Sequence, residues 1–198
     1  MGKIKSQVKI KIAKHDFDFL QPSNSIDTVV RKAIEGDVFE ACAFCNGKIP
    51  GITSDNYLIN NIIKHNTDNI FIFLKNNVIV GVYAMLMLNP LGLERLLLGE
   101  FNTKNPEFLC LTKTNEIPAA IYVWSYIAPG KAANGIRNVS QFLQQKKYRN
   151  INFFARPVTP AGIQISKNLG YEPLENSSNG LFRYVRLINR EPNMQRAA

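Results

Sequence analysis

The chain is poor in the residues that form disulfide frameworks and metal centres, with three cysteines and two histidines in 198 residues. Three cysteines cannot build a disulfide scaffold, and the odd number indicates reduced thiols in a cytoplasmic protein. Cys42 and Cys45 have redox-motif spacing, but the residues before them are predicted to be helical. We therefore interpret both as small buried side chains. Cys110, His15 and His65 follow at irregular spacings, so no metal site is predicted.

The sequence also lacks a long apolar run and a hydrolase motif. The most apolar segment, Val78–Leu88, is too short to span a bilayer and is typical of a buried strand. The basic N-terminus is not followed by the apolar stretch of a secretory signal. No Gly-x-Ser-x-Gly elbow surrounds a serine. These absences predict a soluble cytoplasmic protein with no membrane partner.

Acidic residues are scarce in the last third of the chain. The whole sequence has 24 Lys and Arg against 15 Asp and Glu, a net charge of +9. Residues 131–198 hold 11 basic and 3 acidic residues, whereas residues 21–130 hold 8 and 10. We therefore expect an anionic partner near the C-terminal third. Nucleic acid, a membrane surface and a phosphorylated cofactor all fit this charge, which does not choose among them.

The hydrophobic pattern predicts one mixed α/β domain over residues 1–198, with residues 190–198 as a frayed tail. Strands are predicted at residues 8–12, 70–74, 78–88, 119–127, 151–155 and 181–188. Helices are predicted at residues 25–46, after the Ser54-Asp55-Asn56 cap, from Pro90, at 136–148 and at 160–169. Asn76 and Asn77 lie at the turn of a hairpin.

The most informative arrangement is a strand, a turn that contains Gly135, a helix and a second strand, over residues 119–155. A turn that leads into a helix presents backbone N–H groups without helical partners, and such groups bind anions. A further helix follows, with Thr159 as N-cap, Pro160 at its first position and Gly170 at its end.

Residues 70 to 175 resemble the GNAT family of acyl-CoA-dependent N-acyltransferases. Ile127-x-Pro129 is similar to the Val-x-Pro that closes the family's fourth strand, and Leu169-Gly170-Tyr171 is similar to the end of its last conserved segment. In the family's pyrophosphate loop, which falls on residues 132–137, Gly135 matches. The resemblance implies an α/β (α+β) fold: a mixed, mostly antiparallel sheet of six or seven strands, helices on both faces, and a splay beside Pro129.

The resemblance also implies acetyl (acyl) transfer from acetyl-CoA to a primary amine by direct attack. The cofactor-binding residues that it indicates are Ile127, Lys131, Ala133, Asn134, Gly135, Ile136 and Arg137. Tyr126 and Ser166 are the catalytic candidates, and Ser166 stands where the family has a tyrosine. The general base stays open among His65, Glu100 and Glu116.

Two other functions fit the sequence. One is a catalytically silent domain of the same fold that acts through binding. The other is a nucleic-acid-binding protein, in which basic residues contact phosphates. The basic candidates are Lys146, Lys147, Arg149, Arg183, Arg186 and Arg190. The amine acceptor, a small molecule or a protein, is not identified by the sequence, which is also compatible with a homodimer.

Overall fold

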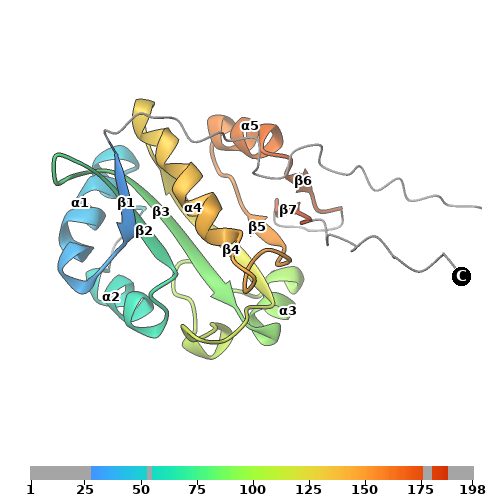
Figure 1. The fold of residues 1–198 in the computed structure, drawn as a ribbon. Coiled ribbons are helices and arrows are strands. Elements are labelled where there is room, and N and C mark those ends of the chain that lie inside the picture. Colours follow the sequence, from blue (N-terminus) through green and yellow to red (C-terminus); the bar gives the residue numbers. More distant parts are fainter. Residues whose placement is uncertain (1–27, 53–54, 176–179, 187–198) are drawn as a thin grey trace, which may run out of the picture.

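The computed structural model describes residues 28–52, 55–175 and 180–186, in which helices cover both faces of a seven-stranded sheet (Figure 1). The strands are β1 (Val29–Lys32), β2 (Ile70–Lys75), β3 (Val78–Leu88), β4 (Ala120–Ile127), β5 (Phe153–Ala155), β6 (Glu172–Pro173) and β7 (Phe182–Tyr184). The α-helices are α1 (Val38–Lys48), α2 (Asn56–His65), α3 (Pro90–Leu98), α4 (Ile136–Leu143) and α5 (Pro160–Asn168). Short 3₁₀ helices are η2 (Glu35–Asp37), η3 (Phe108–Cys110) and η4 (Gly130–Gly135).

The strands lie in the order β1-β2-β3-β4-β5-β7-β6. Neighbouring strands are antiparallel except for β4 and β5, which are parallel and are connected through α4. A parallel pair needs such a crossover because the chain must return to the same end of the sheet. The mixed, mostly antiparallel sheet that the sequence predicted is therefore confirmed.

Alternating side chains on the central strands pack into two separate hydrophobic layers, one on each face of the sheet. On β3, Ala84 and Leu86 pack toward α1, α2 and α3, whereas Met85 and Met87 pack toward α4 and α5. Both faces of β3 are covered, which explains why Val78–Leu88 is apolar almost throughout. The prediction of helices on both faces is confirmed.

The helix starts follow the capping residues of the sequence. Asp55 accepts a hydrogen bond from the Tyr57 N–H at 2.8 Å, and Thr159 accepts one from the Gly162 N–H at 3.0 Å. At the β2–β3 turn, Asn76 and Asn77 adopt positive φ angles of 50° and 62°, which asparagine tolerates better than most residues.

The prediction of a helix over residues 25–46 is wrong in its first part, because Val29–Lys32 form the edge strand β1 and helix α1 begins at Val38. Consecutive β-branched residues favour a strand, and pairing with β2 places Val30 against the layer beneath α4. Helix α4 ends at Leu143, earlier than the predicted residue 148. The predicted strand at residues 8–12, the tail at 190–198 and the end of the predicted strand at 181–188 lie outside the described residues.

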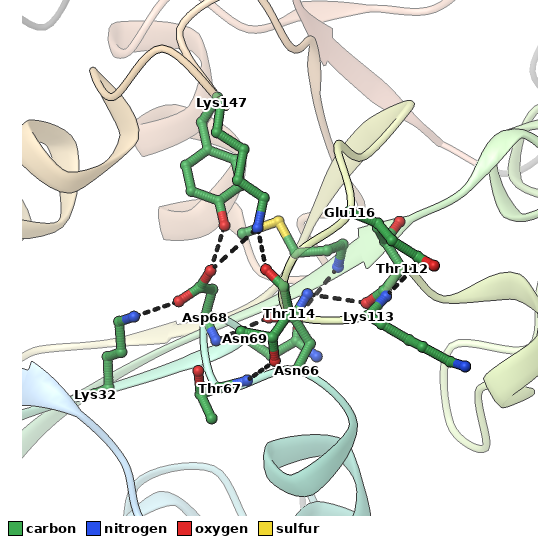
Figure 2. A network of polar contacts seen from close by, with 12 residues as sticks. Lys32, Asn66, Thr67, Asp68, Asn69, Thr112, Lys113, Thr114, Glu116 and Lys147 are labelled. Carbon is green, nitrogen blue, oxygen red and sulfur yellow. Dashed lines mark hydrogen bonds and ion pairs between the residues drawn. The ribbon is translucent and has the colours of Figure 1, made fainter.

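A network of polar contacts around Asp68 fastens the start of β2 to distant parts of the chain (Figure 2). Its carboxylate accepts a hydrogen bond from the Tyr148 phenol and pairs with the ammonium groups of Lys32 and, at 3.5 Å, Lys147. The Lys147 ammonium also donates to the carbonyl oxygen of Thr114. The network therefore joins β1, β2, the loop before β4 and the turn after α4.

Burial of the Asp68 side chain, which is 7% exposed, opposes its ionisation. Hydrogen bonds from Lys32 and Tyr148 and the charges of Lys32 and Lys147 outweigh burial and hold the pKa of Asp68 below its usual range. The carboxylate is therefore ionised at neutral pH.

Candidate functional site

Strands β4 and β5 separate partway along their length. Their pairing runs from Ile121 opposite Phe153 to Val123 opposite Ala155, where β5 ends. Strand β4 continues to Ile127, so its last four residues have no partner in β5. The two strands are thus no longer paired beyond Val123, and the V-shaped splay beside Pro129 stays a prediction.

A β-bulge in β4 lies at this separation. Ser125 is opposite Ala84 on β3, but Val123 is opposite the next residue, Met85, so Trp124 is the additional residue. A bulge shifts the alternation of side chains beyond it. As a result, Trp124 and Ser125 both line a cavity on the side of α1 and α2, whereas Tyr126 packs in the layer on the other face.

The cavity has a volume of about 480 Å³, a size suited to a small-molecule ligand. Helices α1 and α2 form one wall, and β4 with the chain just after β5 forms another. Its lining residues are Ala41, Cys42, Cys45, Gly51, Ile52, Asp55, Leu58, Ile59, Ile70, Val82, Ala84, Thr103, Lys104, Tyr122, Trp124, Ser125, Arg156 and Val158. The cavity therefore opens beside the point where β4 and β5 part.

Two polar side chains of this cavity have buried atoms without partners among the described residues. Arg156 directly follows β5, and its Nε and Nη2 atoms are buried with no hydrogen-bond partner there. The hydroxyl oxygen of Ser125 is in the same situation. Buried donors are rarely left unpaired, because an unmade hydrogen bond costs the desolvation of the group.

Tyr122 places a phenol close to this pair. Burial raises the pKa of Tyr122, and the Arg156 charge and a hydrogen bond with Thr103 oppose that rise without cancelling it. Next to it, the indole N–H of Trp124 donates to the Thr103 carbonyl at 2.7 Å. Both aromatic side chains are therefore held in place by the loop after α3, and the phenol keeps its proton at neutral pH.

The cysteines of the cavity wall are structural. Cys42 and Cys45 are buried on α1. Burial, together with the neighbouring Cys42, raises the pKa of the Cys45 thiol to about 12, so this thiol is not a nucleophile at neutral pH. The interpretation of both residues as small buried side chains is confirmed. Among the described residues, no group of three His, Cys, Asp or Glu is placed to hold a metal ion.

The two predicted catalytic residues lie outside the cavity lining. The Tyr126 ring packs edge-on against Tyr83 at 5.6 Å, and its hydroxyl donates to the Ala133 carbonyl at 3.3 Å. Burial raises the pKa of Tyr126 to about 12. Ser166 lies half-buried on α5, where its carbonyl accepts a hydrogen bond from the Tyr171 N–H. Their roles stay predictions.

The predicted cofactor segment forms η4 and the first turn of α4. The Ala132 N–H donates to the Pro129 carbonyl, which leaves the N–H groups of Gly130 and Lys131 without partners inside the 3₁₀ helix. Lys131 and Asn134 are exposed, whereas Gly135 is buried against the sheet together with Ile127 at the end of β4. Ala133, Ile136 and Arg137 are half-buried.

Gly135 is required by packing against the strands below it. A Cβ atom at this position would lie 2.8 Å from Phe73 Cδ2 and 3.0 Å from Val30 Cγ2, closer than side chains approach one another. This glycine therefore lets η4 lie directly on β1 and β2.

The candidate bases are also absent from the cavity lining. The His65 ring, at the end of α2, contacts the Leu111 carbonyl at 3.4 Å and lies tilted against the Phe108 ring, with the ring centroids 5.4 Å apart. Glu116 accepts a hydrogen bond from the Lys113 N–H, and Glu100 follows α3.

Sequence reasoning named Tyr122 as a possible substitute for the catalytic tyrosine, but it missed Trp124, Ser125 and Arg156, which complete the chemistry of this cavity. The available signal was a cluster of aromatic residues in one strand and an arginine directly after the next strand. The bulge that brings Trp124 and Ser125 to one side has no such signal, because regular alternation would separate them.

No protein-family model and no curated protein sequence matches this chain. Among the described residues, no helix is both long and apolar enough to cross a membrane.

Solved structures with the same architecture are found despite low sequence identity. The loading GNATL domain of CurA from Lyngbya majuscula has 16% identity and a TM-score of 0.60, over 80% of this chain and 97% of that domain. Ard1 from Thermoplasma volcanium has 7% identity and a TM-score of 0.54, over 82% and 100%. An N-acetyltransferase from Staphylococcus aureus Mu50 has 14% identity and a TM-score of 0.51, over 80% and 98%. The strand order, the separation of β4 from β5 and these likenesses together establish that the chain has the GNAT fold.

Proposed function

We propose that the protein transfers an acyl group, such as acetyl, from an acyl-CoA to a primary amine. The observation that carries the proposal is the separation of β4 from β5 next to a small-molecule cavity. The last four residues of β4 have backbone groups that β5 does not pair, and the cavity lies beside them. The GNAT fold, shared with an N-acetyltransferase from Staphylococcus aureus Mu50, agrees with this activity.

The residues of η4 and α4 fit a diphosphate. The unpaired N–H groups of Gly130 and Lys131 and the Lys131 ammonium offer donors at one end of η4. Residues 133–137, from Ala133 and Asn134 through Gly135 and Ile136 to Arg137, continue this surface into α4. When bound, an acyl-CoA supplies the thioester whose carbonyl carbon is attacked.

In the proposed reaction, the backbone N–H of Tyr126 or Ile127 donates to the thioester carbonyl oxygen as negative charge develops there. The amine nitrogen forms a bond to the carbonyl carbon, and the carbon–sulfur bond breaks. The amine loses a proton to a base, and the departing thiolate receives one from Tyr126 or Ser166. A pKa of about 12 keeps the Tyr126 phenol protonated and able to donate at neutral pH.

The test is thermal unfolding with and without acetyl-CoA, at low and high salt, with ATP as a control anion. At about 100 times its dissociation constant, a ligand that binds only the folded state stabilises it by roughly 2.7 kcal/mol. We expect a shift with acetyl-CoA that persists at high salt and is not reproduced by ATP, followed by CoA release when an amine acceptor is added.

Two results would contradict the proposal in different ways. A persistent shift with no CoA release across a broad panel of amines favours a catalytically silent domain of the same fold. A shift that ATP reproduces and salt abolishes favours binding of nucleic acid through the basic C-terminal third, since phosphate contacts weaken steeply with salt.

A further inference from the structure

We propose that the cavity between α1, α2 and β4 binds a small apolar ligand by its carboxylate group, with Arg156 as the anchoring residue. The inference rests on the proposed function in that the ligand is a reactant of the transfer. The binding itself is tested without any transfer reaction.

The net positive charge of the cavity lining favours an anionic ligand. Among its lining residues, Arg156 and Lys104 are basic and Asp55 is the acidic one. The Asp55 carboxylate already caps helix α2 through the Tyr57 N–H at 2.8 Å. The Arg156 Nε and Nη2 atoms are buried and have no hydrogen-bond partner among the described residues. A guanidinium in this state is costly unless a ligand supplies the missing acceptor oxygens.

The geometry of the donors favours a carboxylate. The Nε–H and Nη2–H groups of a guanidinium lie side by side and bind two oxygens of one planar group. The Ser125 hydroxyl has no partner among the described residues, and the Tyr122 phenol lies near enough to Arg156 for the guanidinium charge to oppose the rise in the pKa of the phenol. Arg156, Lys104 and Asp55 together give the lining a net charge of +1, which balances the single charge of a carboxylate, whereas a phosphate dianion against these mostly apolar walls would remain half neutralised.

The rest of the cavity wall is suited to hydrocarbon. Helices α1 and α2 contribute Ala41, Cys42, Leu58 and Ile59, and β4 contributes the face of Trp124. A volume of about 480 Å³ admits a molecule the size of an amino acid with a large side chain. The ligand is therefore a carboxylate that carries an apolar group.

The carboxylate has two chemical sources in an acyl transfer. It belongs either to the amine acceptor, which is then an apolar amino acid, or to the acyl group, which is then derived from a dicarboxylic acid. In both cases Arg156 holds the carboxylate beside the unpaired end of β4.

The experiment is calorimetric titration of the whole chain with probes matched in shape. The first arm uses L-leucine, L-phenylalanine and 4-methylpentanoate against L-leucinamide, which lacks the carboxylate. The second arm uses malonyl-CoA and succinyl-CoA against acetyl-CoA. Inorganic phosphate tests whether any anion suffices. Each probe is also titrated into Arg156→Gln, Arg156→Lys and the control Arg183→Gln, which removes an exposed arginine on β7.

We expect carboxylates of at least one arm to bind at least tenfold more tightly than the counterparts that lack the carboxylate. Arg156→Gln should remove about tenfold to a hundredfold of that affinity, because a charge-assisted hydrogen bond contributes about 1.5–3 kcal/mol. Arg156→Lys should restore part of it, and Arg183→Gln should change nothing. Binding in the first arm identifies the acceptor as the carboxylate source, and binding in the second identifies the acyl group.

The inference is overturned if no carboxylate binds in either arm, if L-leucinamide or phosphate binds as well as the carboxylates, or if Arg156→Gln binds like the unaltered chain. Acetyl-CoA provides the separation from the proposed function, because it has no free carboxylate on its acyl group. Acetyl-CoA binding with no carboxylate binding overturns this inference alone.

Discussion

Two charged side chains of the described residues, the buried Asp68 and the half-buried Arg156, have opposite surroundings. Asp68 is partnered by two ammonium groups and a phenol that come from two other parts of the chain, β1 and the turn after α4 (Figure 2). Arg156 has a guanidinium of which two nitrogen atoms are buried without a partner among the described residues. The Asp68 carboxylate stabilises the fold, whereas the Arg156 guanidinium lowers the stability of the unliganded fold.

The difference distinguishes a charged residue that holds the fold together from one that is available to bind a ligand. A buried charge with partners stabilises its neighbours. Removing one member of such a group destabilises the protein, because the other charges lose their counter-charge. A buried charge without partners gains its stabilisation only when something binds. A substitution of Asp68 should therefore lower mainly the stability, whereas a substitution of Arg156 should weaken mainly the binding of a ligand.

The largest expected effect is the loss of stability in Asp68→Asn. This variant keeps the shape of the side chain but leaves Lys32 and Lys147 without their shared counter-charge. We expect a loss of about 3 kcal/mol, a decrease in melting temperature of roughly 6–12 °C for a chain of this length. Arg156→Gln should melt at the same temperature or higher. Differential scanning calorimetry of both variants checks the pair, and a larger loss in Arg156→Gln would contradict it.

The second effect concerns Gly135, whose added Cβ would lie 2.8 Å from Phe73 Cδ2. We expect Gly135→Ala to lose about 1–3 kcal/mol through overpacking. The matched control is Gly47→Ala in α1, where a Cβ meets nothing within 4 Å and alanine is the better helix former. Urea denaturation should give equal or higher stability for the control. Equal stability of Gly135→Ala and the parent chain would show that η4 does not pack tightly on β1 and β2.

A smaller effect is the pH dependence that Asp68 brings. Its pKa is lower in the folded state than the ordinary value of 3.8, so the unfolded chain binds more protons in this range. The stabilisation is therefore complete above about pH 5 and is lost as the pH falls through the folded-state pKa. The free energy of unfolding, measured by urea denaturation at several pH values between 3 and 6, should change less with pH for Asp68→Asn than for the parent chain. The same pH dependence in both proteins would contradict the ionised state of Asp68.

The smallest expected effect is that of Ser125→Ala. Because the Ser125 Oγ has no partner among the described residues, its removal should leave the melting temperature unchanged. Carboxylate affinity should fall by about twofold to tenfold, since one neutral hydrogen bond is worth about 0.5–1.5 kcal/mol. Tyr122→Phe offers the same comparison at the phenol. A stability loss without a binding loss would place Ser125 with the structural residues.

Much of the fold could be predicted from the sequence because local signals were strong. The Asn-Asn turn, the Thr159-Pro160 helix start and the apolar segment Val78–Leu88 each have one favoured structure. The edge strand β1 was missed because its pairing with β2 depends on a partner some forty residues away.

The cavity was harder to predict, because several segments far apart in the sequence build it. Arg156 reaches Tyr122 only through the parallel pairing of β4 and β5, and Ser125 faces the cavity only because of the bulge at Trp124. No local sequence pattern predicts either the parallel pairing or the bulge. The predicted cofactor residues lie in one continuous segment, which is why a motif could suggest them.

The most direct test of the account is calorimetric titration of acetyl-CoA into the parent chain, Lys131→Gln and Arg156→Gln. In the two proposals, the cofactor lies on the η4 side of the sheet and the carboxylate lies on the α1–α2 side. We therefore expect binding to the parent chain, affinity weakened severalfold in Lys131→Gln, and unchanged affinity in Arg156→Gln. Absence of acetyl-CoA binding to the folded parent chain would contradict the proposed function, and loss of binding only in Arg156→Gln would contradict the division between the two sides.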